Sequence, residues 1–323
     1  MECVVTGARG FVGRGLLPVL AAAGHVGTAT GRTAPVDLPS GWRGMARGEC
    51  LASVPSPVPD TIIHLEVEKT VPSAADPASI DRVNVGATRA WLDWATKHGV
   101  RRFVLVSSIL ATVPVGARGS EESPLATGLT YGGSKARAEA EVRAWVAAGE
   151  GRRGVILRPA AVYGPDPASN LLPFARRVIA GRRCLIGAGA TPRSVVARGN
   201  LTAAIAFALA AAEAGCAVYQ VSDPQPTTVA DLAALIAELA DAPPPRSIPL
   251  AVARMAAPIG DLLGRVTGRV LPLSSARLAA LQGASHFPPD RLVAAGFVHP
   301  QSTREGIAEM LAWMARGPAT PGP

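Results

Sequence analysis

The stretch VVTGARGFVG, residues 4–13, decides the fold, because it places three glycines between a short apolar run and an amphipathic segment. Gly7, Gly10 and Gly13 follow the apolar residues 2–6 at the spacing T-G-x-x-G-x-x-G. The first glycine permits a tight turn and the second lets the backbone approach a pyrophosphate. The third lets a helix pack close to its strand, and the N-terminus of that helix favours negative charge. The stretch therefore predicts a dinucleotide-binding turn between a strand and a helix.

Apolar strands and amphipathic helices alternate after this turn. Strands are expected at residues 26–30, 60–65, 101–109 and 154–160, and helices at residues 11–25, 80–99 and from residue 131 onward. This alternation is typical of a parallel sheet covered by helices on both faces. We predict an α/β fold with a doubly wound parallel sheet of the Rossmann type.

The composition of the chain changes near residue 161, where turn residues become frequent. We expect an NAD(P)-binding Rossmann domain over residues 1–160 and a smaller C-terminal α/β substrate-binding domain over residues 161–316. A strand near 217–223 is expected to return to the main sheet, and residues 317–323 to form a disordered tail.

Composition excludes several classes of function. The 323 residues are 48% hydrophobic and 17% charged, which is typical of a globular protein. The net charge is +8, but the arginines are scattered and no basic run carries interleaved aromatics, so no nucleic-acid partner is expected. The four cysteines form no Cys-x-x-Cys pair, the five histidines are dispersed, and no metal site is readable. We expect a cytoplasmic protein with reduced thiols.

Residues 201–221 are apolar enough to raise the question of a membrane span. Glu213 lies inside this segment and Gly215 interrupts it. A buried helix followed by a buried strand explains the segment, so no membrane insertion is expected.

The end of the second predicted strand selects the dinucleotide. An acidic residue there would bind a ribose 2′-hydroxyl, whereas this chain has Gly31 and then Arg32. A guanidinium suits a 2′-phosphate, so NADP(H) is favoured and NAD(H) remains possible. Glu49 is the expected acceptor for the adenine amino group, and Arg9 and Phe11 in the glycine loop are also expected to contact the cofactor.

The stretch TYGGSKARAEAEV, residues 130–142, places Tyr131 and Lys135 one helical turn apart, with about 6 Å between them. An ammonium group favours the phenolate form of a nearby tyrosine and so lowers its pKa. The pair therefore predicts a side chain able to donate and accept a proton near neutral pH.

These features occur together in one known family. The glycine loop is followed in order by HL (64–65), Asn84, VSS (106–108), YGGSK (131–135) and LRPAAVYGP (157–165). In this the chain resembles the extended short-chain dehydrogenase/reductases, and more narrowly the NAD-dependent epimerase/dehydratase family that acts on nucleotide sugars. The resemblance covers about residues 2–316.

The resemblance implies roles for individual residues. Tyr131 would be the catalytic acid/base, and Lys135 its partner, which also holds the nicotinamide ribose. Ser108 would hydrogen-bond the reacting oxygen, with Ser107 as the alternative. Asn84 would help to position the lysine and the cofactor, and Leu65 and Lys69 would lie at the cofactor.

On the substrate side, the segment SNLLP resembles the part of the family that meets a nucleotide diphosphate, which nominates Asn170 and Leu171. Arg193 falls where the family carries an arginine that grips the same diphosphate. The chain is most similar here to bacterial UDP-hexose 4-epimerases and 4-ketoreductases.

The chain also departs from the family. Glu66 and Val67 follow HL where most members have two small residues, and a carboxylate near a pyrophosphate is unfavourable unless it points away or pairs with Lys69 or Arg9. The segment ATVPVG lacks the aromatic residue that often follows the serines, and no proline precedes Tyr131. These departures bear on the substrate more than on the reaction type.

We therefore expect an NAD(P)-dependent enzyme, an NADPH-dependent 4-ketoreductase of a nucleotide sugar. The alternatives are a UDP-hexose 4-epimerase with tightly bound NAD and a reductase of a lipophilic ketone of steroid or flavonoid type, with residues 250–266 lining an apolar pocket. A non-catalytic NADP-sensing protein is a further alternative.

A homodimer is expected from the resemblance, because many members pair through the helices around 81–98 and 131–148. Val142, Trp145 and Val146 fit such an interface, and core packing explains them equally well.

Overall fold

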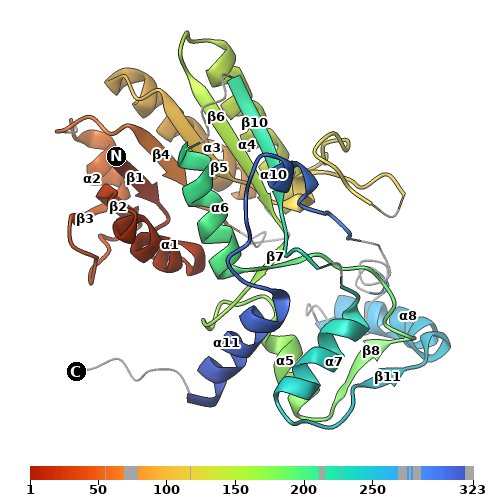
Figure 1. The fold of residues 1–323 in the computed structure, drawn as a ribbon. Coiled ribbons are helices and arrows are strands. Elements are labelled where there is room, and N and C mark those ends of the chain that lie inside the picture. Colours follow the sequence, from red (N-terminus) through yellow and green to blue (C-terminus); the bar gives the residue numbers. More distant parts are fainter. Residues whose placement is uncertain are drawn as a thin grey trace.

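A parallel seven-stranded sheet forms the centre of the larger part of the molecule (Figure 1). The computed structural model describes residues 1–54, 56–68, 79–116, 118–210, 215–225, 227–267, 275, 278 and 285–316, and the sheet is counted within them. Its order is β10 (Gly215–Val221), β6 (Arg153–Pro159), β5 (Arg102–Val106), β4 (Thr61–His64), β1 (Glu2–Thr6), β2 (Val26–Gly31) and β3 (Trp42–Ala46). All neighbouring pairs in it are parallel, which confirms the predicted doubly wound sheet.

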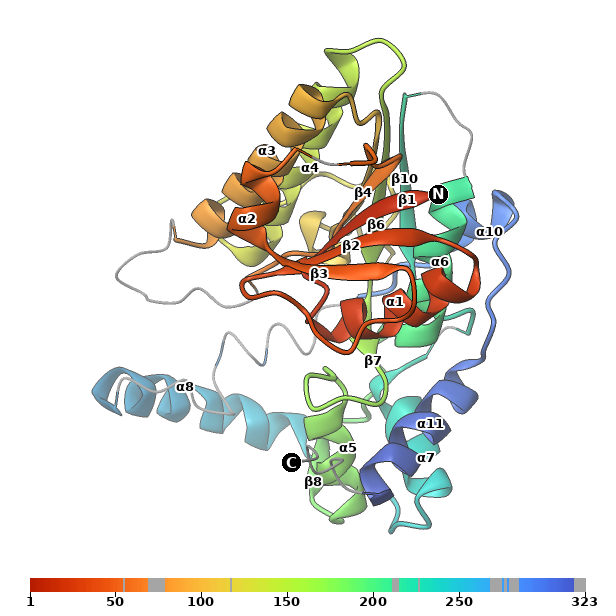
Figure 2. The same ribbon diagram turned by 90° about the vertical axis from the view of Figure 1, so that its left-hand side faces the viewer.

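Helices cover both faces of this sheet, because side chains on each strand alternate between two apolar clusters (Figure 2). One face packs against α1 (Phe11–Ala22) and α6 (Arg198–Ala210), with Val5 and Ile63 of the sheet meeting Leu16 and Ile205 of the helices. The other face packs against α2 (Arg47–Ala52), α3 (Ser79–His98) and α4 (Tyr131–Ala147).

The residues considered for a dimer interface belong to this second face. Val142 and Trp145 are buried against Phe103 and Trp91 within one chain, and Val146 packs against the same cluster. Their apolar character is therefore explained by the core of a single subunit.

The smaller part of the molecule carries two short parallel sheets and four helices within the described residues. The strands are β7 (Ala161–Tyr163) with β9 (Val195–Ala197), and β8 (Arg183–Ile186) with β11 (Arg246–Ile248). The helices are α5 (Leu172–Ile179), α7 (Val229–Leu239), α8 (Leu250–Thr267) and α11 (Thr303–Arg316), and α8 extends to one side (Figure 2). The single-turn η1 (Ile109–Ala111) follows β5, and α10 (Asp290–Ala294) lies near β10.

Two further sequence expectations concern particular segments. The apolar stretch 201–221 contributes to α6 and then to β10, which pairs with β6 in the large sheet. Among the helices that the structure describes, none has the length and apolarity to cross a bilayer. Lys69 and the tail 317–323 lie outside the described residues.

Candidate active site

The glycine loop lies where the strand order of the large sheet reverses, since β1 has β4 on one side and β2 on the other. Ligands of doubly wound folds bind beyond the carboxyl ends of strands at such a point. Gly7 has a positive φ of 65°, and a Cβ there would lie 2.9 Å from the backbone nitrogen of Glu66. Only glycine lets the loop approach the segment after β4 this closely. Thr6 fixes the same approach, because its Oγ1 accepts from the backbone nitrogens of Leu65 (3.2 Å) and Glu66 (3.3 Å).

A cavity of about 420 Å³ opens beside this loop. It is lined by Gly7, Arg9, Gly10, Gly31, Arg32, Arg47, Leu65, Glu66, Val67, Glu68 and Val83. Bare glycine backbone and three arginines, of which Arg9 and Arg32 are exposed and Arg47 is half-buried, fit a dinucleotide phosphate at a switch point. Five of the residues predicted to bind the cofactor come together here, namely Gly7, Arg9, Gly10, Arg32 and Leu65.

Three other predicted cofactor residues lie elsewhere. Phe11 is buried in the core, with the Arg198 guanidinium 5.2 Å from its ring. Gly13 is a packing residue, since a Cβ there would meet the Ala8 carbonyl oxygen at 2.5 Å. Glu49 is exposed on α2 and lies outside the lining of the cavity, whereas Arg47 of the same helix is part of it. The short helix α2 turns position 47, and not 49, toward the hollow.

Glu66, the carboxylate that departs from the family pattern, is paired. Its Oε1 lies 3.0 Å from Nη1 of Arg47, a partner that the sequence did not indicate. The ion pair compensates a negative charge that would otherwise face the phosphates. The partner was missed because the contact joins α2 to the loop after β4, two segments with no sequence relation.

Asn84 of α3 holds the loop after β4 by hydrogen bonds. Its Oδ1 accepts from the backbone nitrogen of Glu68 (2.7 Å), and its Nδ2 donates to the Glu68 carbonyl (3.0 Å) and to Ser134 Oγ (2.9 Å). Ser134 in turn donates to the Tyr131 carbonyl at 2.8 Å. The side chain is 2% exposed, so these bonds are shielded from water. Asn84 thereby ties the cofactor cavity to the first turn of α4.

Tyr131, Lys135 and Ser108 meet at the start of α4. Thr130 caps this helix by accepting from the Gly133 backbone nitrogen at 3.1 Å. A Cβ at Gly132 would lie 2.1 Å from the Leu110 carbonyl, so a glycine lets the helix start against η1. Tyr131 is hydrogen-bonded to Ser108, and Lys135 Nζ donates to the Val106 carbonyl at 2.8 Å.

Burial changes the acidity of this pair in a way that the sequence did not predict. The pKa of Tyr131 is raised above its usual value, because burial disfavours the phenolate and the Ser108 hydrogen bond only partly offsets this. The expectation that Lys135 lowers the pKa of Tyr131 is therefore wrong for this structure. Burial also lowers the pKa of Lys135 to about 8, against an opposing effect of Glu139.

A second cavity, of about 360 Å³, opens directly onto Tyr131. It is lined by Ser107, Ser108, Ile109, Leu110, Tyr131, Pro159, Ala160, Ala161, Val162, Asn170, Arg193, Ser194 and Ser285. The catalytic candidates Tyr131 and Ser108 thus share one hollow with the predicted substrate residues Asn170 and Arg193. Leu171 is directed elsewhere, because it is the N-cap residue of α5 and packs against the apolar cluster of the smaller part.

Arg193 is held in place by its own backbone. Its nitrogen donates to the Thr227 carbonyl at 2.8 Å, and its carbonyl accepts from Thr227 Oγ1 at 2.9 Å. Partial burial lowers the pKa of its guanidinium, and the side chain lines the cavity. Such a group favours an anionic ligand.

Sequence reasoning missed several lining residues. Ser194 and Ser285 reach the cavity through the pairing of β9 with β7 and of Arg193 with Ser285, which no local pattern predicts. Two buried charged residues outside this lining, Glu139 and Arg158, could have been singled out from the sequence. Glu139 lies four residues after Lys135, and Arg158 interrupts an apolar strand.

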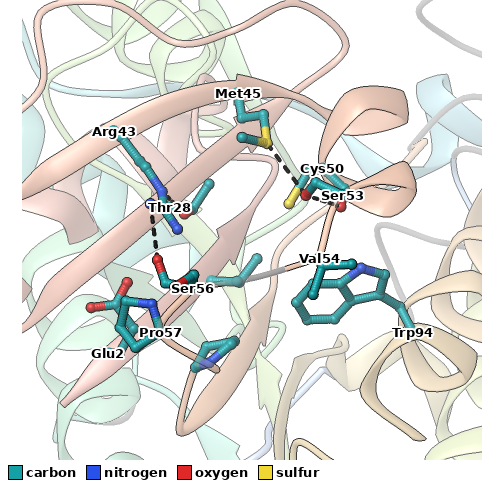
Figure 3. Close-up of a pocket in the computed structure, with 12 residues that line it drawn as sticks. Glu2, Thr28, Arg43, Met45, Cys50, Ser53, Val54, Ser56, Pro57 and Trp94 are labelled. Atoms are coloured by element: carbon teal, nitrogen blue, oxygen red, sulfur yellow. Dashed lines mark hydrogen bonds between the residues drawn. The ribbon is translucent and has the colours of Figure 1, made fainter. Parts of the chain in front are cut away.

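A smaller hollow of about 160 Å³ lies at the amino ends of β1 and β2, between β3, α2 and Trp94 of α3 (Figure 3). Arg43 ties two sides of this hollow together. Arg43 donates to Thr28 Oγ1 (2.8 Å) and to the Ser56 carbonyl (3.5 Å). Parallel strands place their catalytic residues at the opposite, carboxyl ends, so this hollow is separate from the candidate site.

Comparison with known proteins agrees with this geometry. The sequence profile described as "NAD dependent epimerase/dehydratase family" matches residues 3–222. The chain belongs to the NAD-dependent epimerase/dehydratase family. It is therefore an enzyme of the short-chain dehydrogenase/reductase type, with a Rossmann sheet that binds a nicotinamide dinucleotide.

Individual relatives of this family member differ in their named activities. The chain is 30% identical to the 3-diazoavenalumate denitrifying reductase of a Streptomyces species, over 77% of this chain and 84% of the relative. It is 34% identical to the uncharacterized protein y4nL of Sinorhizobium fredii, over 48% of this chain, and the match spans 44% of the length of y4nL. The UDP-glucose 4-epimerase of Thermus thermophilus, solved with NAD, has the same fold, with a TM-score of 0.74 and 23% identity over 99% of this chain and 100% of that one.

Proposed function

We propose that this family member is an NADPH-dependent ketoreductase that acts on a nucleotide-linked 4-keto sugar. The observation that carries the proposal is the shared cavity, in which Tyr131 and Ser108 face Asn170 and Arg193. A proton donor for a ketone oxygen and a cation for a phosphate are then parts of one site. A relative named as a reductase, matched over most of both chains, supports reduction as the direction.

In this proposal the bound dinucleotide supplies the hydride, and the residues of the chain handle the oxygen. Tyr131 donates a proton to the ketone oxygen, while Ser108 orients that oxygen by a hydrogen bond. The raised pKa of Tyr131 keeps the phenol protonated before the reaction, which suits a proton donor. Lys135 supplies positive charge that stabilises the phenolate left behind.

The cofactor preference rests on Arg32 and Arg9, which both line the first cavity. A 2′-phosphate would meet Arg32 at the end of β2, where an acidic residue would repel it. Arg47 contributes less free charge there, because Glu66 pairs with it.

A lipophilic ketone is a second candidate, and the lining of the reactive cavity favours it. Ile109, Leu110, Ala160 and Val162 form an apolar part of that lining. Substituting Arg193→Leu separates the two substrates. The change should abolish turnover of a nucleotide-linked ketone and leave turnover of an uncharged lipophilic ketone nearly unchanged.

The cofactor content of the purified protein tests the reductase proposal. We expect protein without a retained dinucleotide that binds NADPH more tightly than NADH. Arg32→Ala should weaken NADPH binding by about tenfold to a hundredfold and change NADH binding little, because it removes one charge-assisted contact. Arg101→Ala, which removes another exposed arginine outside both cavities, is the matched control.

Stoichiometric NAD that remains bound through gel filtration would contradict the reductase. It would favour the alternative, a UDP-hexose 4-epimerase, which must keep its hydride between two half-reactions. Equal affinity for NADPH and NADH in the wild type would overturn the role of Arg32.

A further inference from the structure

A buried carboxylate follows Lys135 by one turn of α4. Glu139 is fully buried, and both of its oxygens are occupied. Oε1 accepts from Ser107 Oγ (2.7 Å) and from Arg158 Nε (2.9 Å), and Oε2 accepts from Arg158 Nη2 (2.7 Å). The arginine therefore holds the carboxylate with two donors at once, which fixes its orientation.

Arg158 is itself anchored from the far side. It is 1% exposed, and its Nη1 donates to the Glu121 carbonyl at 2.8 Å. The Glu121 side chain accepts from the Gln220 backbone nitrogen at 2.8 Å. The carboxylate on α4 is thus oriented by groups on β6 and β10, and by Ser107 at the end of β5.

Burying such an ion pair contributes little to stability, because removing two charges from water costs about as much as their attraction returns. An apolar pair of the same size would fill the space as well. The retained charges therefore require another explanation, and Lys135 is the charged side chain one turn away.

Lys135 has an unusual environment for an ammonium group. It is 2% exposed, and its Nζ donates to the Val106 carbonyl. The titratable groups that face it are Tyr131 and Glu139 on α4 and His64 on β4, with Arg158 on β6 beyond Glu139. Arg143 on α4 also pairs with Glu139, since its Nη2 lies 3.4 Å from Oε2. His64 is fully buried, and burial and the nearby Lys135 hold its pKa well below the usual range, so it stays neutral. Among these groups, Glu139 carries the negative charge.

We propose that Glu139, oriented by Arg158 and Ser107, is a positioning residue that keeps Lys135 in its ammonium form for Tyr131. Ser107 then serves this network, while its neighbour Ser108 serves Tyr131. Burial lowers the pKa of Lys135 to about 8, and Glu139 raises that pKa, which is the direction that the proposal requires. The role of Lys135 beside Tyr131 rests on the proposed function, but the charge of Lys135 can be measured without substrate.

The sequence makes that measurement simple, because Lys69, Lys97 and Lys135 are the only lysines. Protein labelled with ¹³C at lysine Cε gives three NMR signals, which Lys69→Arg and Lys97→Arg assign. The Cε shift reports the fraction of ammonium directly as pH is raised. Lys97, exposed on α3, is the internal reference.

Glu139→Gln keeps the shape of the side chain and removes its charge. We expect the ammonium-to-amine ratio of Lys135 at pH 8 to fall about tenfold, because an opposing charge is lost and Arg158 is left unneutralised. Glu141→Gln is the matched control on the same helix, since Glu141 pairs with Arg89 at the surface, and it should leave the titration unchanged.

Removing one partner of a buried pair can prevent folding, so a double variant accompanies the single one. Glu139→Gln with Arg158→Met removes both charges and keeps a filled core, and Lys135 should still titrate at lower pH than in the wild type. A Lys135 titration that matches the wild type in every folded Glu139 variant would overturn the proposal and leave the pair a structural one. Loss of ketone reduction plays no part in this readout, so failure of the proposed function would be seen separately.

Discussion

At the scale of single residues, the motif predicts that Tyr131 and Lys135 lie together, whereas burial determines their pKa values. Their spacing on one helix is local, so the sequence was sufficient to bring them together. The direction in which the pKa of Tyr131 moves is set by the tertiary structure, because desolvation outweighs the Ser108 hydrogen bond. The same desolvation makes Lys135 sensitive to its surroundings.

The pH dependence of stability tests the burial of Lys135. Burial lowers its pKa from 10.5 to about 8. Below pH 8 both the folded and unfolded states carry the proton, so the destabilisation is fully present. Between pH 8 and 10.5 the folded state releases its proton while the unfolded state keeps it, so this group makes the free energy of unfolding rise.

Lys135→Met removes that contribution. The unfolding free energy of the variant relative to the wild type should therefore fall by about 2–3 kcal/mol between pH 7 and pH 10. Urea unfolding of both proteins at the two pH values measures this difference. A difference that does not change with pH would show that Lys135 titrates normally.

At the scale of elements, the buried apolar strands were predictable, whereas the exposed edge strand and the three-residue strands were not. Strands β1, β4, β5 and β6 are buried apolar runs that the alternation with helices marked correctly. β3 carries exposed residues on the sheet edge, and β7 and β9 are three residues long. Their pairing depends on distant partners, so no local period indicates them.

The hydrogen bonds of Asn84 to Glu68 and Ser134, called the Asn84 clamp below, join three elements. They connect α3, the loop after β4 and α4. Asn84→Ala should cost about 2–4 kcal/mol of stability, since the backbone groups of Glu68 lose their partners. It should also weaken NADPH binding by about tenfold or more, because residues 65–68 line the cofactor cavity.

Thr88→Ala provides the control for the clamp. Thr88 is buried on the same helix and donates to the Asn84 carbonyl, so its loss lowers stability without touching the loop. Fluorescence titration with NADPH and urea unfolding measure the two effects. Equal NADPH affinity in the wild type and in Asn84→Ala would contradict the clamp.

At the scale of the whole molecule, the site exists only because segments far apart in sequence meet. Asp223, just after β10, accepts from the Tyr163 hydroxyl (2.6 Å), the Ala197 nitrogen (2.8 Å), Asn200 Nδ2 (2.8 Å) and Thr303 Oγ1 (3.2 Å). This buried carboxylate joins β7, β9, α6 and α11 to the large sheet.

The reactive cavity is a product of that assembly. Tyr131 begins α4 and Ser108 follows β5, both in the larger part of the molecule, whereas Asn170, Arg193 and Ser285 come from the smaller part. Motifs could nominate the first group and two members of the second. They could not show that Leu171 turns into a core, that Glu49 stays at the surface or that Arg47 pairs with Glu66.

The most direct test of the central claim follows a deuterium label from the reactive C4 position of NADPH into the product of a ketone panel. The panel includes nucleotide-linked 4-keto sugars and uncharged lipophilic ketones. We expect the label on the new carbinol carbon with the wild type. Tyr131→Phe should reduce the rate by about a hundredfold or more and leave NADPH affinity unchanged. Label transfer that is independent of Tyr131, or no net transfer to any ketone, would contradict the account.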